Sequence, residues 1–115
     1  MAKNIFTPVS DLSELAGAIE RSQDTPTVLF LHDMWCPISG NAYKEMSRLP
    51  AEDQDKTALI DVTSGKALSQ AIEAQTGVRH ESPQVILLRH GKAAWNASHF
   101  GITAKAVTAA IAENA

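Results

Sequence analysis

The stretch TVLFLHDMWCPIS, residues 27–39, decides the fold of this chain. Its first part, Thr27 to His32, is short, β-branched at its start and apolar on both alternating faces, as expected of a strand buried on both sides of a sheet. Its last part begins with Cys36-Pro37, and proline suits the first position of a helix, where its missing N–H costs nothing. The stretch therefore predicts a central strand that leads into a helix.

Outward from this stretch, helical and strand patterns alternate along the chain. The predicted elements are a helix from an N-cap at Ser10 to about Ser22, the strand Thr27 to His32, a helix from Pro37 that ends before Pro50, a strand over Thr57 to Val62, a helix over Ser64 to Thr76 closed by Gly77, a hairpin of Gln84 to Arg89 and Ala93 to Ala97 that turns at His90-Gly91-Lys92, and a last helix capped by Thr103. The acidic run Glu52-Asp53-Gln54-Asp55 is predicted to be a solvated loop. This order predicts an α/β fold in which helices cover both faces of a mixed four-stranded sheet.

Size and composition limit the possible classes of protein. A chain of 115 residues, 44% hydrophobic and 20% charged, is typical of one globular domain over residues 1–115. The net charge of −3 and the scattered basic residues argue against binding to nucleic acid or to a membrane surface. No apolar run is long enough for a secretory signal or a membrane span, so we expect a cytoplasmic protein in a reducing compartment.

The chain has a single cysteine, Cys36, which excludes an intramolecular disulfide and a four-cysteine metal site. At the start of a helix, unpaired N–H groups and the positive end of the dipole stabilise a thiolate. Helix N-termini lower the pKa of a cysteine thiol from about 8.5 to between about 3.5 and 7.5. Free cysteine is also a common small residue of protein cores. The position of Cys36 between a turn and Pro37 favours the nucleophile.

Two neighbours of Cys36 and two residues far along the chain are candidates for helping this thiol. Ser39 stands where a second cysteine would stand in a Cys-x-x-Cys pair; its hydroxyl either donates to the sulfur or caps the helix. Trp35 either forms an apolar platform beside the sulfur or packs against the sheet. Ser82-Pro83 directly precedes a strand, where a cis bond would turn the Ser82 backbone outward to pair with an extended thiol-bearing substrate.

The histidines do not predict a metal site, because no local group has the spacing of zinc ligands. His90 is expected to be a solvated turn residue. His32 and His99 are candidates to lie near the sulfur and favour its thiolate.

Two longer segments carry a resemblance to a known family. HDMWCPISGNAYKE, residues 32–45, and RHESPQVILLRHGKAAWNASHFGIT, residues 79–103, resemble the YtxJ-type family of monothiol bacilliredoxin-like proteins, within the thioredoxin-like superfamily. The resemblance covers nearly the whole chain and implies a thioredoxin-like fold. It implies that Cys36 is the reactive cysteine, that Pro37, Ile38 and Ser39 complete its motif, and that Pro83 is the cis-proline; Ser98 and His99 match a Ser-His pair of the family.

The resemblance further implies activity on mixed disulfides between proteins and bacillithiol. The expected partners are S-thiolated client proteins and an external thiol or dithiol reductant, and the expected co-substrate is a low-molecular-weight thiol, with no bound cofactor. Trp35 departs from the family, which usually has a small polar residue there, and the chain is rich in Ala and poor in Lys. The identity of the small thiol therefore stays open.

Two other functions compete with this one. The first is a redox-inert thioredoxin-like adaptor, whose thiol would react slowly with alkylating reagents. The second is a module in which two copies of the chain and two small thiols hold an iron–sulfur cluster, as in monothiol glutaredoxins with a Cys-Pro-x-Ser motif. The oligomeric state is not predicted by the sequence.

Overall fold

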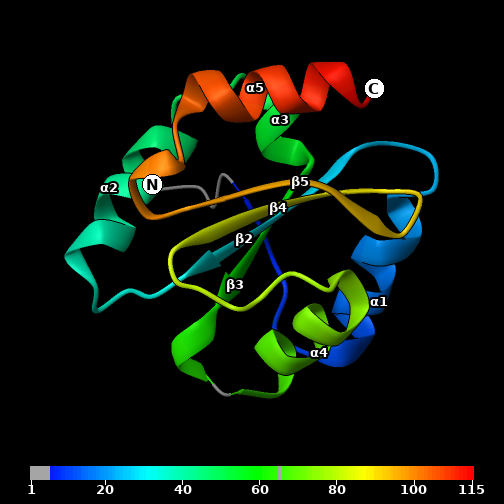
Figure 1. The fold of residues 1–115 in the computed structure, drawn as a ribbon, viewed down its shortest axis with the longest axis horizontal. Coiled ribbons are helices and arrows are strands. Elements are labelled where there is room, and N and C mark those ends of the chain that lie inside the picture. The colour runs from blue at the N-terminus through cyan, green and yellow to red at the C-terminus, as the bar shows by residue number, and fades with distance from the viewer. Residues whose placement is uncertain (1–5, 65) are drawn as a thin grey trace.

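The computed structural model describes residues 6–64 and 66–115. Its elements are β1 (Thr7–Pro8), α1 (Leu12–Arg21), β2 (Thr27–His32), α2 (Pro37–Met46), α3 (Ala51–Asp55), β3 (Thr57–Asp61), the 3-10 turn η1 (Val62–Ser64), α4 (Lys66–Thr76), β4 (Gln84–Arg89), β5 (Lys92–Ser98), the 3-10 turn η2 (His99–Gly101) and α5 (Ala104–Glu113). The strands form one mixed sheet in the order β1-β3-β2-β4-β5 (Figure 1). The predicted α/β fold is confirmed.

The sheet has five strands, so the predicted number of four is wrong. The additional strand is β1, which pairs with β3 in parallel over only two residues, Thr7 and Pro8. So short a strand carries no alternating pattern of its own, and its place at the edge is compatible with Pro8, which has no N–H to donate.

β2 is the central strand, as its sequence predicts. It pairs in parallel with β3 and antiparallel with β4, and every residue from Thr27 to Leu31 is buried. Successive side chains of a strand point to opposite faces, so β2 contributes to a core on each side of the sheet. Val28 and Phe30 pack with residues of α2 and α5, whereas Leu29 and Leu31 pack with residues of α1 and α4.

Several local predictions differ from the structure; β3 ends at Asp61 and not at Val62, and α4 begins at Lys66 and not at Ser64. The N-cap of α1 is Asp11 rather than Ser10, because the Asp11 carboxylate accepts from the Glu14 N–H at 2.7 Å. The predicted loop over Glu52 to Asp55 forms α3, in which Asp53 is buried and lies 3.7 Å from the Lys56 ammonium. The hairpin turn contains His90 and Gly91 alone, both at positive φ, so that Lys92 already belongs to β5.

No helix in the described part of the chain is long and apolar enough to cross a membrane.

Candidate functional site

The thiol of Cys36 lies at the junction of the central strand and α2. Cys36 is the N-cap residue of α2, with extended backbone angles, and Pro37 occupies the first helical turn, as the sequence predicts. The Cys36 N–H donates to the Asp33 carbonyl at 3.1 Å, and the Cys36 carbonyl accepts from the Gly40 N–H at 3.2 Å. Cys36 is partly exposed and its side chain makes no capping hydrogen bond, so the thiol is not used in closing the helix.

Ser39 fixes the turn that carries Cys36. Its side chain is fully buried, and its hydroxyl oxygen accepts from the Asp33 N–H at 3.2 Å. The Asp33 carboxylate in turn accepts from the Trp35 N–H at 2.9 Å. Asp33 thus binds Ser39, Trp35 and Cys36, and this arrangement holds the strand end against the first turn of α2.

Exposed apolar side chains lie in this turn and in η2. Trp35 is 80% exposed, Met34 60% and Phe100 68%. Of the two interpretations of Trp35, packing against the sheet does not occur. Pro37 is also exposed and Ile38 partly so. Phe100 belongs to η2, which packs beside α2, so the apolar side chains come from two segments distant in the sequence.

The Ser82-Pro83 segment emerges at the same end of the sheet. The register of the strands places Leu31, Gln84 and Ser98 in one row across β2, β4 and β5. The segments that continue beyond this row, toward Cys36, Pro83 and His99, therefore leave one end of the sheet together. The Ser82–Pro83 peptide bond is cis.

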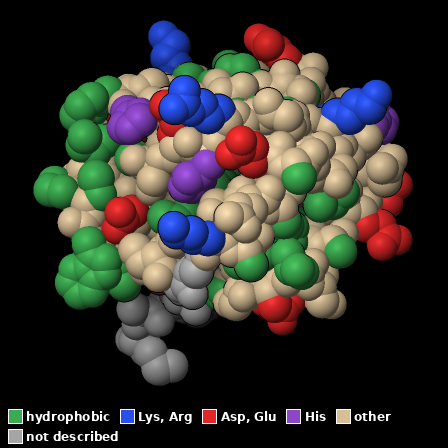
Figure 2. All heavy atoms as spheres, turned by 60° about the horizontal axis from the view of Figure 1, so that its bottom comes forward, with side chains coloured by type: hydrophobic (Ala, Val, Ile, Leu, Met, Phe, Trp, Pro, Cys, Tyr) green, Lys and Arg blue, Asp and Glu red, His purple; other side chains and the backbone are tan. Residues whose placement is uncertain are grey.

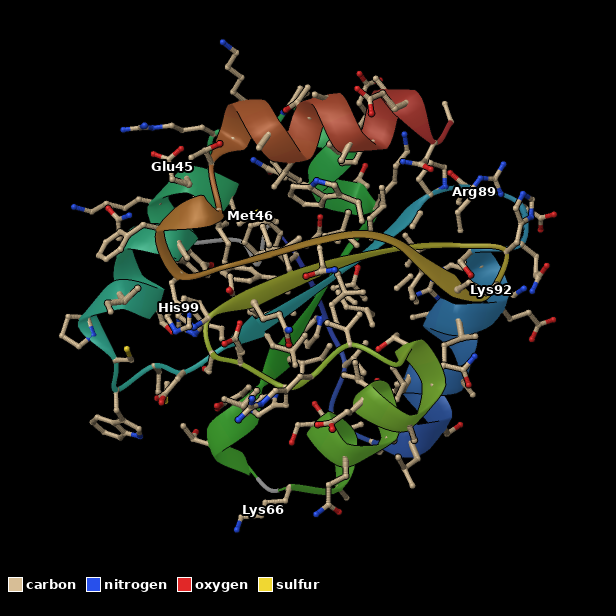
Figure 3. The ribbon with its side chains drawn as sticks, viewed as in Figure 1. Glu45, Met46, Lys66, Arg89, Lys92 and His99 are labelled. Atoms are coloured by element: carbon tan, nitrogen blue, oxygen red, sulfur yellow. The ribbon has the colours of Figure 1, made fainter. Side chains whose placement is uncertain are left out.

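The Ser98-His99 pair contacts the proline segment through its backbone. The His99 N–H donates to the Pro83 carbonyl at 3.0 Å, and His99 has a φ of 53°, in the left-handed region. Figure 3 shows His99 on the side of the molecule where α2 begins, at the opposite end of the sheet from Arg89 and Lys92. The structure thus brings Pro83 and His99 together, whereas their part in any reaction stays a prediction.

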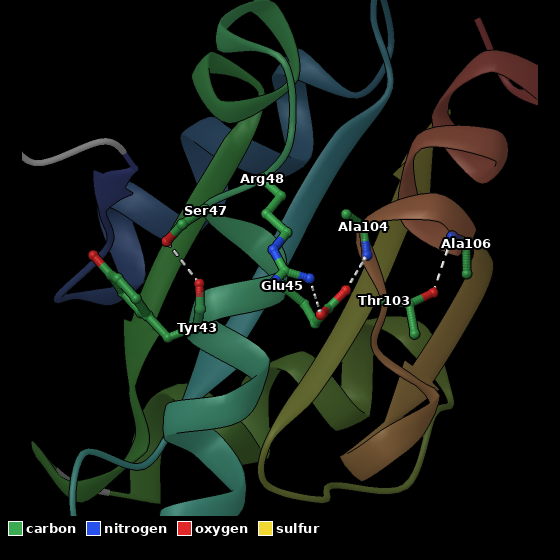
Figure 4. Close-up of polar contacts among 7 residues, drawn as sticks. All are labelled: Tyr43, Glu45, Ser47, Arg48, Thr103, Ala104 and Ala106. Atoms are coloured by element: carbon green, nitrogen blue, oxygen red, sulfur yellow. Dashed lines mark hydrogen bonds and ion pairs between the residues drawn. The ribbon is translucent and has the colours of Figure 1, made fainter.

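Glu45 ties α2 to the segment that follows η2. One carboxylate oxygen accepts from the Ala104 N–H at 3.0 Å, at the start of α5, and the other lies 2.8 Å from the Arg48 guanidinium (Figure 4). Thr103 caps the same helix through its hydroxyl, which accepts from the Ala106 N–H at 3.1 Å. A carboxylate at the N-terminus of a helix is favoured by the helix dipole. Sequence analysis missed Glu45 because its partner lies 59 residues away.

His32 is packed among aromatic rings at the end of β2. Its ring makes edge contacts with Tyr43, at 5.4 Å between centroids, and with Phe30, at 5.6 Å. Burial lowers the pKa of His32 below its ordinary value of 6.5, while the negative charges of Asp61 and Asp33 act in the opposite direction. The net shift is downward, so desolvation outweighs the two carboxylates and favours the neutral ring.

The described residues contain no group of three or more His, Cys, Asp or Glu side chains with the geometry of a metal site.

Two comparisons agree with this geometry. The model of the family described as monothiol bacilliredoxin BrxC matches residues 7–107, and thereby confirms the predicted family. A solved structure whose description names a thioredoxin fold and a provisional oxidoreductase role is 27% identical, with a TM-score of 0.83, over 92% of this chain and 93% of that chain.

More distant solved structures share the fold. A thioredoxin from Fasciola hepatica is 15% identical, with a TM-score of 0.74, over 96% of this chain and 100% of that chain. A thioredoxin variant from Halobacterium salinarum is 21% identical, with a TM-score of 0.72, over 99% of this chain and 95% of that chain. These likenesses establish a thioredoxin fold, as the resemblance implies.

Proposed function

This chain belongs to the monothiol bacilliredoxin family, and from that premise we propose that it removes a low-molecular-weight thiol, bacillithiol or a close analogue, from protein mixed disulfides. The reactive group of the proposal is Cys36, supported by its neighbours Trp35, Pro37, Ile38 and Ser39. Ser82, Pro83, Ser98 and His99 are proposed to bind the substrate at the same end of the sheet.

The placement of Cys36 is the observation that carries this proposal. Cys36 is partly exposed at the N-cap of α2, the end of a helix at which the dipole favours negative charge. Pro37 follows directly and provides no N–H of its own at the first helical position. A thiolate, not a thiol, is the nucleophile in thiol–disulfide exchange.

The reaction needs one sulfur on this chain. The Cys36 thiolate attacks the small-thiol sulfur of the mixed disulfide, the old S–S bond breaks, and the client sulfur leaves as a thiolate that takes a proton from water. Cys36 is then disulfide-bonded to the small thiol. A second thiolate from outside attacks that small-thiol sulfur and regenerates Cys36.

The external thiol or dithiol is obligatory in this scheme. Ser39 stands where dithiol relatives of this motif would carry a second cysteine, and the chain contains no other cysteine. The exposed side chains of Met34, Trp35 and Phe100 provide apolar surface for the client beside the sulfur. Free thiols persist in reducing compartments, so we propose that the protein works in the cytoplasm.

The proposal is tested with a reporter protein that carries bacillithiol on a single cysteine. We expect that incubation with the wild-type chain releases the reporter thiol and adds one bacillithiol to Cys36, both seen by intact-mass spectrometry. Cys36→Ser is expected to abolish both changes, because Cys36 is the only cysteine of the chain.

Two outcomes count against the proposal. If Cys36 stays unmodified and the reporter stays thiolated at neutral pH, the chain is not a de-thiolating enzyme. If Cys36 also reacts with iodoacetamide no faster than a cysteine in an unstructured peptide, the redox-inert adaptor is the better interpretation.

A further inference from the structure

A pocket of about 360 Å³ adjoins the turn that carries Cys36. Its walls come from the end of β2, from the residue after β3, from one face of α4 and from the segment before Pro83; the lining residues are Asp33, Val62, Lys66, Ser69, Gln70, Glu73, His80 and Ser82. This volume falls within the range of small-molecule sites, about 300–1,000 Å³. Figure 2 brings this side of the molecule forward and shows basic, acidic and histidine side chains gathered on it.

One lining residue of the pocket, Asp33, lies three residues before Cys36 in the sequence. The Cys36 N–H donates to the carbonyl of Asp33, a lining residue, at 3.1 Å. The ends of such a four-residue turn are less than about 7 Å apart between Cα atoms. The opposite wall includes Ser82, which directly precedes Pro83. A molecule in the pocket therefore lies beside the proposed reaction centre.

Two buried polar atoms of the proline segment have no partner in the described part of the chain. They are Nδ1 of His80 and Oγ of Ser82. The backbone of the same segment is well paired: the Gln84 amide donates to the Arg79 carbonyl at 2.8 Å, and the Glu81 N–H donates to the Gln84 side-chain oxygen at 3.2 Å. Buried polar groups are rarely left unpaired, so these two atoms point to a ligand.

The lining carries charges of both signs, two carboxylates and one ammonium, and so favours a ligand that itself carries both signs. Its two carboxylates already accept from backbone donors, Glu73 from the His80 N–H at 3.2 Å and Asp33 from the Trp35 N–H. Lys66 forms no ion pair with any residue that the structure describes, and it is the only Lys or Arg in this lining. Figure 3 shows Lys66 at the start of α4. A ligand carboxylate would pair with this ammonium, and a ligand amino group would pair with the lining carboxylates.

The polar groups follow one face of α4. Lys66, Ser69, Gln70 and Glu73 are spaced i, i+3, i+4 and i+7, which places them on one side of a helix over about 10 Å. A ligand that binds along this row would place a carboxylate beside Lys66 and hydrogen-bonding groups beside Glu73.

We propose that this pocket binds the body of the small thiol, whose carboxylate pairs with Lys66 and whose hydroxyl or amino groups bind His80, Ser82 and Glu73. The proposal rests on the proposed function and adds the place on this chain where the small thiol binds. It assigns Lys66 and His80 to a binding site that extends beyond the Cys36 motif.

The test compares two disulfides that differ in the body attached to sulfur. Bacillithiol disulfide carries carboxylates and hydroxyls, whereas bis(2-hydroxyethyl) disulfide is small and uncharged. In each reaction Cys36 gains one small thiol, one S–S bond breaks, and the other half leaves as a thiolate. The rate of mass increase on Cys36 is measured for both probes.

Lys66→Glu is expected to slow the reaction with bacillithiol disulfide by about fivefold or more, because it replaces an attractive charge with a repulsive one. The reaction with the uncharged probe should keep its rate. Lys105→Glu makes the same charge change at an exposed position of α5 and should leave both rates unchanged. These results together support the pocket.

Ser82→Ala separates binding from a structural role. A buried hydroxyl without a partner costs stability, so its removal should leave the free energy of unfolding unchanged or raise it. The same variant should react more slowly with bacillithiol disulfide. A loss of stability with unchanged rates would assign Ser82 a structural role and count against the proposal.

Three other outcomes would count against the proposed pocket. Equal rates for wild type and Lys66→Glu with bacillithiol disulfide would overturn the pocket and leave the proposed function standing. A slowing confined to a bacillithiol-bearing reporter protein would show that the pocket receives the client instead, which is also contrary to the proposal. If wild-type Cys36 reacts with neither probe, the proposed function and the pocket fail together.

Discussion

Ser22 and Ser39 are both fully buried, but they serve opposite ends of the sheet. Ser22 precedes β2, where its hydroxyl donates to the Ile19 carbonyl and accepts from the Gly91 N–H at 2.9 Å in the β4–β5 hairpin. Ser39 follows β2, where its hydroxyl accepts from the Asp33 N–H in the turn that carries Cys36. One serine closes a turn that has no proposed function, and the other closes the candidate site.

The two ends differ in how completely they are paired and covered. At the hairpin, Arg89 donates to the Asn114, Ser22 and Gln23 carbonyls at 2.9, 3.1 and 3.0 Å. At the Cys36 end, large apolar side chains are exposed and two buried polar atoms lack partners in the described part of the chain. Groups left unpaired or uncovered cost stability, so their concentration at one end is expected where a substrate supplies the missing contacts.

The largest effect on stability should come from Arg89. Arg89→Met leaves three backbone carbonyls without their charged donor, and we expect a loss of about 2–4 kcal/mol in the free energy of unfolding, measured with urea. Arg48→Met is the control, because Arg48 pairs with Glu45 in the open and is 69% exposed; its loss should stay below about 1 kcal/mol. Folded Arg89→Met should react with disulfides at the wild-type rate.

Substitution of the two serines tests whether the two ends of the sheet act independently on stability and on reaction rate. Ser22→Ala leaves the N–H of buried Gly91 without a partner and should cost about 1–3 kcal/mol, with no change in the rate at which folded protein reacts through Cys36. Ser39→Ala should cost about 1 kcal/mol, because it removes one hydrogen bond between neutral groups, the bond from the Asp33 N–H. It should also slow release of the reporter thiol severalfold without abolishing it. An equal slowing in both variants would show that the ends are not independent.

The parts of the fold that the sequence predicts are those with a strong local pattern. The bounds of β2 and β4 match the prediction at both ends, since each is a run of four apolar residues with one polar or charged residue at either end. The sequence does not predict β1, because two residues show no periodic pattern. It does not predict α3, because nothing in a run of four polar or charged residues indicates that one of them, Asp53, is buried. The sequence predicts a hairpin turn one residue longer than the observed one, because a histidine at positive φ, as His90 is, is uncommon.

The candidate site divides in the same way. Cys36-Pro37 and Ser82-Pro83 can be found in the sequence, because cysteine before a helix and proline before a strand have local physical meaning. The bond from Asp33 to Ser39 spans six residues, and that from Glu45 to Ala104 spans 59, so only the folded chain shows them. The pocket is of the latter kind, because its walls come from four separate segments.

The smallest predicted effect concerns His32, which belongs to the Cys36 end. Its pKa is lowered by burial, so between that value and about 6.5 the unfolded chain binds more protons than the folded one. The contribution of His32 to stability is therefore complete above about pH 6.5 and declines as the pH falls toward the lowered pKa. His32→Phe keeps the ring contacts with Tyr43 and Phe30 and removes the titration. Urea unfolding at pH 7.5 and 5.5 should show a smaller loss of stability on acidification in this variant than in wild type.

His90→Asn is the matched control at the other end, because it removes an exposed imidazole from the hairpin turn and places there a residue that tolerates positive φ. It should keep the pH difference of the wild type, since that difference is assigned to the buried ring. If His90→Asn removes the difference and His32→Phe keeps it, the acid sensitivity belongs to the hairpin, and the Cys36 end is then set apart by its unpaired atoms and exposed apolar surface alone.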